Sequence, residues 1–533
     1  MSQSLVDEAL HRFNRLVNNA TGDEVFGRLP VSRSTAATLA MLAPLILLLV
    51  KWAYFPSVDA REPPVLLPKF PLVGHIYGLA TESCSYFVRL MRKKRMGIVT
   101  LPMLNGKMYL ISSPPLIQAA MRNRDLSFDP FAVEFSHHLL DVEDKWVKYW
   151  GRPGWYQTMT DLIHAALTGE NLRRMKAECY HQLAATLNGY RGSKTIDIPN
   201  VYDWLALIIP RAFTRALYGE KNPFDDEAIQ ALWDFDDNVT ILAYNIFPKL
   251  LARKSVAGRE LLQKKLRPYY ENAHYSNPDV SALIRNRATK CLDEDGGNID
   301  LLCKTEMNLA WASVTNTVPD LFWLVCNVFS RPQTLEHFRA EVLDMTTLTP
   351  DGKGGRLGVI DANALIERPF VAATYWEVHR VYNESLGNRR VMRDTTLVDT
   401  TDGKEYQLVK GINLQWVVGA VHRDANFWGA DSDEFRPERW LEGHEKAQSK
   451  SIFPFGGGRN LCPGKAFAIS ESLGVLAVLA MAFDFEGIQV PRAKGPLLSA
   501  AMRRPIWGEV DPGMKMRKRR EFEDVTWRFK LEK

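Results

Sequence analysis

Two short apolar runs near the start of the main body are rich in side chains that favour strands. They cover residues 97–101 and 107–111, and Asn105-Gly106 lies between them. An Asn-Gly pair between two such runs is a strong signal for a tight turn joining antiparallel strands. The pattern therefore predicts a β-hairpin at this place.

Longer stretches predict helices. Between about residues 132 and 290 apolar positions recur at spacings of three and four, the period of one helix face. Residues 301–329 predict another long helix, which Arg331-Pro332 ends. Pro319 lies inside this helix, where it removes one backbone hydrogen bond and is expected to kink the axis.

An uncharged stretch near the N-terminus differs from all of these. Residues 35–50 are dense in Leu, Ala and Ile, and one lysine and three aromatic residues follow by residue 55. Together they reach roughly 20 residues, which is enough to cross a bilayer with aromatic and basic side chains at one interface. We therefore expect an N-terminal segment at residues 1–34 and a transmembrane anchor at 35–55. A buried core helix is the alternative.

Proline is frequent directly after the predicted anchor, at residues 56–74, where Pro63-Pro64 forms the densest part. Proline fixes the backbone and removes a donor, so this segment is expected to be a stiff, extended hinge and not a helix.

The composition narrows the possible functions. Of 533 residues, 46% are hydrophobic and 24% charged, and the net charge of +5 is modest. This balance gives no indication of nucleic-acid binding. No C-x-x-C pair occurs, which argues against a zinc site or a disulfide framework and suits a reducing compartment. The six scattered cysteines are Cys84, Cys179, Cys291, Cys303, Cys326 and Cys462.

The candidate chemistry is concentrated at residues 455–464, where three consecutive glycines precede one cysteine. The glycines allow a tight turn and a close approach to a flat, bulky group. Cys462 precedes an apolar run with helical spacing, and the N–H groups and dipole of a helix N-terminus favour a thiolate. A thiolate in such a loop is a good axial ligand for haem iron. A buried structural cysteine in a glycine-rich turn is the alternative.

This loop resembles the haem-binding loop of the cytochromes P-450. Phe455, Gly458, Cys462 and Gly464 match the family pattern in identity and spacing. The resemblance implies haem b (iron protoporphyrin IX), with Cys462 as the axial ligand of the iron. The family usually has Arg or His, bonded to a haem propionate, at the position of Asn460.

The same resemblance implies a fold. It is mainly α with small β-sheets, and residues 75–533 would form a single haem-thiolate catalytic domain behind the membrane anchor and the hinge.

A second motif strengthens the resemblance. Glu377 and Arg380 lie three apart on one predicted helix face, where they can pair. Arg439 follows in the run Phe435-Arg436-Pro437-Glu438-Arg439-Trp440, before the glycine loop. In the family these three residues form a buried ion-pair network that locks the cysteine loop, a structural role.

The long predicted helix differs from the family pattern at two positions. In the family it crosses the distal face of the haem, and an acid and an alcohol there hold water and pass protons. Thr315 replaces the acid and Asn316 the alcohol, and an amide cannot act as an acid near neutral pH. We take both as candidate catalytic residues; a polar patch satisfied within a buried helix is the alternative.

That departure resembles one branch of the family. The residues around Trp311, Asn316 and Pro319 are similar to the sterol and oxysterol 7-alpha-hydroxylases, the sterol 12-alpha-hydroxylases and prostacyclin synthase. The resemblance also makes two further residues candidate partners of haem propionates, Lys176 and Arg389. For Lys176 a solvated basic face is an equal alternative, and for Arg389 an ordinary surface loop.

The resemblance implies a haem-thiolate monooxygenase that oxidises a lipophilic small molecule, such as a steroid, a terpenoid or another secondary metabolite. Electrons would come from NADPH through a separate NADPH-cytochrome P-450 reductase, with cytochrome b5 as a further donor. We expect a single-pass protein of the endoplasmic reticulum membrane with its catalytic domain in the cytosol. A redox-neutral isomerase or dehydratase is the alternative function, and a non-catalytic haem carrier or sensor is a third.

Overall fold

The computed structural model describes residues 58–68, 75–103, 106–190, 195–294, 296–442, 451–495, 500–506 and 513–531. The anchor expected at 35–55 lies outside these residues, as do parts of the hinge. The described part of the hinge, residues 58–68, contains no helix.

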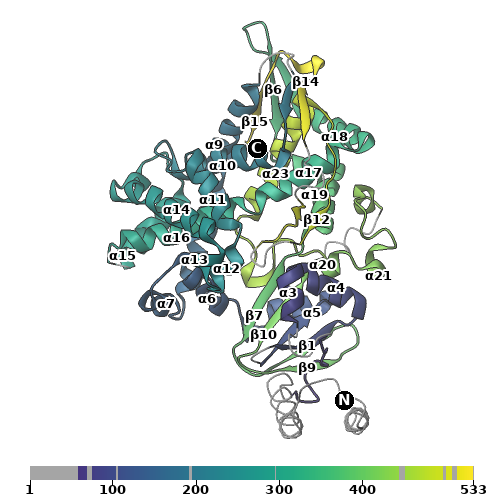
Figure 1. The fold of residues 1–533 in the computed structure, drawn as a ribbon. Helices are drawn as coiled ribbons and strands as arrows, with labels where there is room; N and C mark the ends of the chain where they lie inside the picture. Colours follow the sequence, from purple (N-terminus) through teal and green to yellow (C-terminus); the bar gives the residue numbers. More distant parts are fainter. Residues whose placement is uncertain are drawn as a thin grey trace, which may run out of the picture.

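Helices make up most of the described chain, and the strands form only small sheets, which confirms the mainly α prediction (Figure 1). The helices are α3 (Ile76–Glu82), α4 (Cys84–Lys94), α5 (Pro114–Arg122), α6 (Asp129–Leu140), α7 (Asp144–Trp150), α8 (Trp155–Ala166), α9 (Gly169–Asn188), α10 (Val201–Tyr218), α11 (Asp226–Asp236), α12 (Val239–Ala243), α13 (Pro248–Leu251), α14 (Arg253–Glu271), α15 (Ala282–Glu294), α16 (Ile299–Val314), α17 (Thr317–Phe329), α18 (Pro332–Asp344), α19 (Pro369–Tyr382), α20 (Val418–His422), α21 (Ala425–Trp428) and α23 (Lys465–Ala482).

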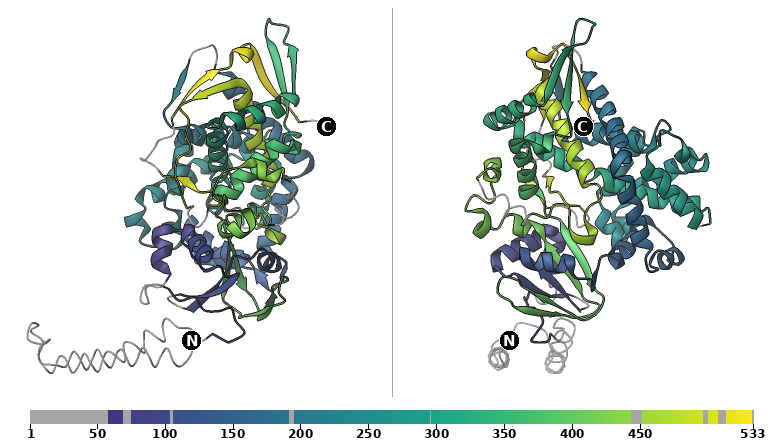
Figure 2. Two further views of the ribbon diagram at one scale, coloured as in Figure 1. Left: turned by 90° about the vertical axis from the view of Figure 1, so that its right-hand side faces the viewer. Right: turned by 180° about the vertical axis from the view of Figure 1, so that it is seen from behind.

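The strands lie mainly at two opposite ends of the molecule, with helices between them (Figures 1 and 2). The strands are β1 (Ile98–Met103), β2 (Gly106–Ile111), β3 (Leu126–Ser127), β4 (Ile196–Ile198), β5 (Thr346–Pro350), β6 (Arg356–Asp361), β7 (Leu386–Val391), β8 (Thr395–Val398), β9 (Glu405–Leu408), β10 (Asn413–Val417), β11 (Phe483–Glu486), β12 (Ala493–Lys494), β13 (Arg504–Pro505), β14 (Met514–Lys518) and β15 (Val525–Lys530).

The largest sheet has the strand order β1-β2-β10-β7-β3. Its first two strands form the predicted hairpin, antiparallel, with Ile98 opposite Ile111. β10 then pairs in parallel with β2, which joins the start of the body to a segment far along the chain. This sheet carries β7, the strand that contains Arg389.

The core is built around α17 and α23, the most apolar helices of the domain. Every residue of α17 is buried, and α23 is buried from Ser470 to Ala482. Within the described ranges α23 is the one helix long and apolar enough to cross a membrane, but most of it is enclosed by protein. A helix that is enclosed in this way belongs to the protein core. Because α23 begins at Lys465, its packing fixes the chain directly after Cys462.

The predicted helix over 301–329 is two helices, so the expectation of one kinked helix is wrong. α16 ends at Val314 and α17 begins at Thr317, with Thr315 and Asn316 between them. The cause is Pro319, which has no N–H to donate to the carbonyl of Thr315 four residues earlier. The interruption therefore lies one turn before the proline, at the two residues singled out as catalytic candidates.

Candidate active site

The cysteine loop is closed by its own backbone. The Cys462 N–H donates to the carbonyl oxygen of Phe455 at 2.9 Å, which brings the two ends of the loop together. Gly456 and Gly458 have φ angles of 71° and 61°, in the left-handed region that favours glycine. Gly464 then caps α23. The four residues of the family pattern thus shape one turn.

The close approach that the glycines permit is to another part of the protein. A Cβ on Gly458 would lie 2.5 Å from the carbonyl oxygen of Met121, and a Cβ on Gly457 would lie 2.4 Å from the sulfur of the same methionine. Met121 is in the last turn of α5. The loop is therefore fitted against α5, a contact that the sequence pattern did not indicate.

Cys462 is the exposed cysteine of the six, and the other five are buried. Although Cys462 is reachable by solvent, the protein atoms around it displace part of its water and raise the pKa of its thiol, while the backbone N–H groups of Gly464 and Lys465 lower that pKa by a smaller amount. This balance differs from the expectation that the helix N-terminus alone favours a thiolate. A bound metal cation would supply the missing positive charge, because a coordinating thiol is deprotonated by its metal.

Arg389 and Asn460 meet at a residue that the sequence did not indicate, Tyr156. The Asn460 side chain and Arg389 both lie close enough to the Tyr156 hydroxyl to act on its pKa, which burial raises. Arg389 is 5% exposed and stacks on Trp416 with 4.9 Å between the guanidinium carbon and the ring centre. Tyr156 lies on α8, and no local signal connects it with the other two residues.

Arg389 is a buried cation that forms no ion pair with a carboxylate of the described residues. Its Nη1 donates to the carbonyl of Asn388, and Tyr156 and Asp129 offset only part of the effect of burial on its pKa. Burial accordingly lowers the pKa of Arg389 to about 10. Burying a charge without a partner is expensive, so this site calls for an anion.

Lys176 lies on α9 and lines the same pocket of about 450 Å³ as Cys462 and Lys465. Burial lowers the pKa of Lys176, and the described part of the chain places no acid in contact with it. Lys176, Arg389, Asn460 and an accessible Cys462 suit a haem, which has an iron that takes a thiolate and two anionic propionates.

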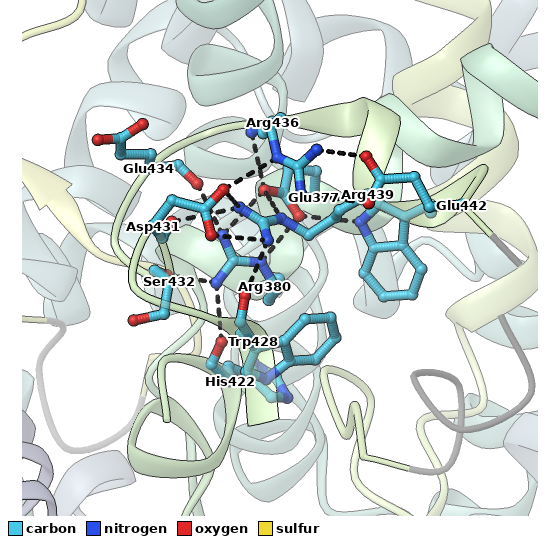
Figure 3. Close-up of polar contacts among 11 residues, drawn as sticks. Glu377, Arg380, His422, Trp428, Asp431, Ser432, Glu434, Arg436, Arg439 and Glu442 are labelled. Atoms are coloured by element: carbon cyan, nitrogen blue, oxygen red, sulfur yellow. Dashed lines mark hydrogen bonds and ion pairs between the residues drawn. The ribbon is translucent and has the colours of Figure 1, made fainter. Parts of the chain in front are cut away.

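The three residues expected to form an ion-pair network are in contact (Figure 3). Arg380 binds the Glu377 carboxylate through Nε and Nη2, each at 2.8 Å, and Arg439 Nε binds Glu377 Oε1 at 2.8 Å. The indole N–H of Trp440 adds a fourth donor at 2.9 Å. All three charged side chains are at most 3% exposed.

The network is connected to the cysteine loop through His422. Arg380 Nη1 donates to the His422 carbonyl at 2.9 Å, and His422 Nε2 accepts the backbone N–H of Phe453 at 3.0 Å. The side chain of Asn383, which precedes β7, donates to the carbonyl of Pro454 at 3.3 Å. Phe453 and Pro454 lead directly into the loop, so both contacts fix its start.

Thr315 and Asn316 lie in the interruption between α16 and α17. Thr315 is 2% exposed, and its N–H donates to the carbonyl of Trp311. The Asn316 side-chain oxygen accepts the backbone N–H of Ala501 at 2.8 Å. Because that contact uses the amide oxygen, the Asn316 NH₂ group is the part left to donate.

Comparison with known proteins agrees with this geometry. Residues 63–501 match the family model described as Cytochrome P450. A Cytochrome P450 monooxygenase of Gibberella zeae is 30% identical over 512 residues, covering 93% of this chain and 96% of the relative. Cytochrome P450 monooxygenase nodJ of Hypoxylon pulicicidum is 28% identical over 492 residues, covering 89% and 93%.

A more distant match is the 25-hydroxycholesterol 7-alpha-hydroxylase of Rattus norvegicus, 26% identical over 309 residues, which cover 54% of this chain and 72% of the relative. The family match spans most of the chain and includes the loop, the ion-pair network and the interrupted helix described above. The chain therefore belongs to the cytochrome P450 family, as a monooxygenase.

Proposed function

We propose that this protein is a membrane-anchored haem-thiolate monooxygenase that hydroxylates or otherwise oxidises a lipophilic small molecule of the steroid or terpenoid type. The observation that carries the haem assignment is the pairing of an accessible Cys462 with a buried Arg389 that has no acid partner. When bound, the haem supplies the activation of dioxygen, with electrons that arrive from outside this chain.

Each candidate residue then has a distinct role. Cys462 would ligate the haem iron as a thiolate, and Phe455, Gly458 and Gly464 keep its loop in shape. Arg389 and Lys176 would bind the propionates as cations, and Asn460 lies beside Tyr156 close to Arg389. Glu377, Arg380 and Arg439 form the network described above. Because that network reaches the loop through His422 and Phe453 and not through Cys462, it positions the loop and takes no part in the reaction.

Asn316 acts as a hydrogen-bond donor on the substrate side of the haem. Its oxygen is held by the N–H of Ala501, so its NH₂ group can hold a water molecule or a substrate oxygen there. Thr315 is the neighbouring hydroxyl, available to the same water. Neither residue can supply a proton as an acid, so protons must reach the site through water.

The substrate class rests on the resemblance to sterol-hydroxylating relatives, among them the rat 25-hydroxycholesterol 7-alpha-hydroxylase. Location in the endoplasmic reticulum membrane rests on the predicted anchor. A patch of exposed apolar side chains supports a membrane-facing surface as well. The patch consists of Tyr244, Ile246, Phe247, Leu250 and Leu251, around α13.

A redox partner follows from the monooxygenase class, and we propose NADPH-cytochrome P450 reductase, with cytochrome b5 as a second donor. Lys465 lines the pocket beside Cys462, which gives this side of the molecule positive charge suited to an acidic partner.

The test begins with the purified full-length protein. Dithionite reduction under carbon monoxide should give the absorption band of a thiolate-ligated haem. Sterols and terpenoids that shift the Soret band are then incubated with and without NADPH and reductase. The expected result is a product with one added oxygen that forms only when NADPH and reductase are present. A haem band without the thiolate signature would overturn the assignment of Cys462.

A redox-neutral isomerase or dehydratase is the alternative function. The missing acid–alcohol pair at Thr315 and Asn316 is compatible with it but does not distinguish it from hydroxylation. The same incubation separates the two functions. A rearranged product formed equally well without NADPH would support the second candidate and exclude the first for that substrate.

A further inference from the structure

A short segment, residues 500–506, lies against the interrupted helix pair and is called the strap here. The N–H of Ala501 donates to Asn316, and the carbonyl of Arg503 accepts the indole N–H of Trp323 at 2.8 Å. The strap thus binds α16–α17 at the interruption and again two turns later. It also pairs with the loop before β7, where Arg503 N–H donates to the Tyr382 carbonyl at 2.8 Å.

A third contact joins the strap to α11. The Asp236 carboxylate, at the end of α11, is 1% exposed and forms an ion pair with Arg504 of the strap. Its other oxygen accepts the indole N–H of Trp311, on α16, at 2.8 Å. One buried carboxylate therefore connects three elements that are far apart in the sequence.

These contacts of Asp236 lie close to the interruption between α16 and α17. Trp311 lies four residues before Thr315, and Phe235 beside Asp236 makes an edge-to-face contact with the Trp311 ring, 5.7 Å between centres. Family membership places the substrate on the side of the haem that faces α16 and α17. A shift of α11 would therefore move Trp311 and the strap together, and both are connected to the interruption that contains Thr315 and Asn316.

We propose that Asp236 is a positioning residue that holds α11 closed against α16 and the strap, and thereby controls how readily a bulky ligand enters and leaves the substrate side of the haem. Removing its charge leaves Arg504 buried without its anion and frees α11 from the strap. The proposal depends on haem binding but not on the identity of the substrate.

The test uses two ligands of the ferric haem iron that differ in size, 4-phenylimidazole and imidazole, and the holoprotein of each variant. Association and dissociation rates are measured by stopped-flow at the Soret band. For Asp236→Asn we expect both rates of 4-phenylimidazole to rise by about tenfold, the change that roughly 1.4 kcal/mol produces. The rates of imidazole should change by less than about twofold.

The matched control is Asp234→Asn, which removes a carboxylate two residues earlier on α11. Asp234 pairs with Lys254 and accepts from Gln230, and among the described residues its side chain has no hydrogen bond or ion pair with α16 or the strap. Its rates should equal those of the wild type. Arg504→Gln approaches the same contact from the strap and should reproduce the effect, so the proposal remains testable if Asp236→Asn does not fold. The double variant should behave like either single variant.

A second readout does not involve a ligand. Hydrogen–deuterium exchange of the α11 amides should become faster in Asp236→Asn than in Asp234→Asn, while α10 is unchanged. Equal acceleration of both imidazoles, unchanged rates in folded variants, or additive effects of the two substitutions would overturn the proposal. A loss of thermal stability would also overturn the proposal if the ratio of the 4-phenylimidazole rates to the imidazole rates stayed unchanged.

Discussion

A single buried charge can report what a site is built to bind. Arg389 lies against two aromatic rings and forms no ion pair among the described residues, and Asp129 and Tyr156 offset only part of the effect of burial on its pKa. Such an arrangement is expensive unless an anion completes it. The same reasoning applies less strongly to Lys176, which is only partly buried.

Replacing Arg389 tests this directly. Arg389→Met keeps the volume and removes the charge, so the haem should be lost to apomyoglobin about 10–100-fold faster, since hydrogen bonds to charged groups contribute about 1.5–3 kcal/mol. Arg389→Lys should lie between. The control is Arg390→Met, which removes the neighbouring arginine and its surface pair with Glu134. Equal haem loss from both methionine variants would contradict the role of Arg389.

Asn316 offers a separation of two functions within one side chain. Asn316→Asp keeps an oxygen for the Ala501 N–H but has no NH₂ donor, whereas Asn316→Leu loses both. We expect the aspartate variant to keep its thermal midpoint and to form about tenfold less product per NADPH, as for the loss of one hydrogen bond in the active site. Unimpaired coupling in this variant would show that the donor is dispensable.

Glu471 predicts a pH-dependent stability. It is buried on α23, and burial raises the pKa of its carboxyl from 4.5 to about 8. The folded protein therefore holds this proton more tightly than the unfolded chain does, and Glu471 lowers stability progressively as the pH rises from about 4.5 to 8. Glu471→Gln should raise the thermal midpoint by a few degrees at pH 8 and by much less at pH 5. The exposed Glu336→Gln is the control, without a pH-dependent difference.

At the scale of elements, the ion-pair network joins α19 to the segment that leads into the cysteine loop. Glu377→Gln removes the negative charge and one of the two acceptor oxygens that bind two buried arginines, and should cost about 3–5 kcal/mol of unfolding free energy. The measurement is urea unfolding of holoprotein monitored at the Soret band. Glu442→Gln breaks an exposed pair with Arg436 and should cost at most about 1 kcal/mol. Similar costs for both variants would show that burial of the network is unimportant.

The elements that the sequence predicted well are those with local signals. The β1–β2 hairpin follows from an Asn-Gly pair, and the shape of the cysteine loop follows from its glycines. The sequence predicted a kink caused by Pro319 but not that α16 and α17 are separate helices, although Pro319 determines the interruption at Thr315 and Asn316 through the carbonyl four residues earlier. The meeting of Tyr156, Arg389 and Asn460 could not be predicted, because nothing in one segment specifies its neighbour from another.

At the scale of the whole molecule, the hinge is attached to the body before the first helix. Glu62 is 7% exposed, binds Lys107 at 2.6 Å and accepts the hydroxyl of Tyr109 at 2.6 Å, both in β2. The chain that emerges from the predicted anchor is thus fixed to the largest sheet. This contact would set the orientation of the domain relative to a membrane.

Removing residues 1–57 tests the anchor. We expect the full chain to stay with microsomal membranes after an alkaline carbonate wash, because a span of roughly 20 apolar residues is not extracted. The truncated chain should be released, since the exposed apolar residues around α13 can hold it only at the surface. Retention of the truncated chain after the wash would show that the anchor is not needed for integral attachment.

The pairing of β15 has a consequence for how the protein is made. β15 lies parallel to β6, with Val525 opposite Arg356, and Asn188 of α9 exchanges two hydrogen bonds with Trp527 of the same strand (Figure 1). Both partners leave the ribosome long before β15 is synthesised. One edge of β6 therefore stays open until β15 has been synthesised and has left the ribosome, which exposes that edge to wrong pairing. A nascent chain stalled before residue 525 should need a chaperone, and β6 should be covered only once β15 is available to pair with it.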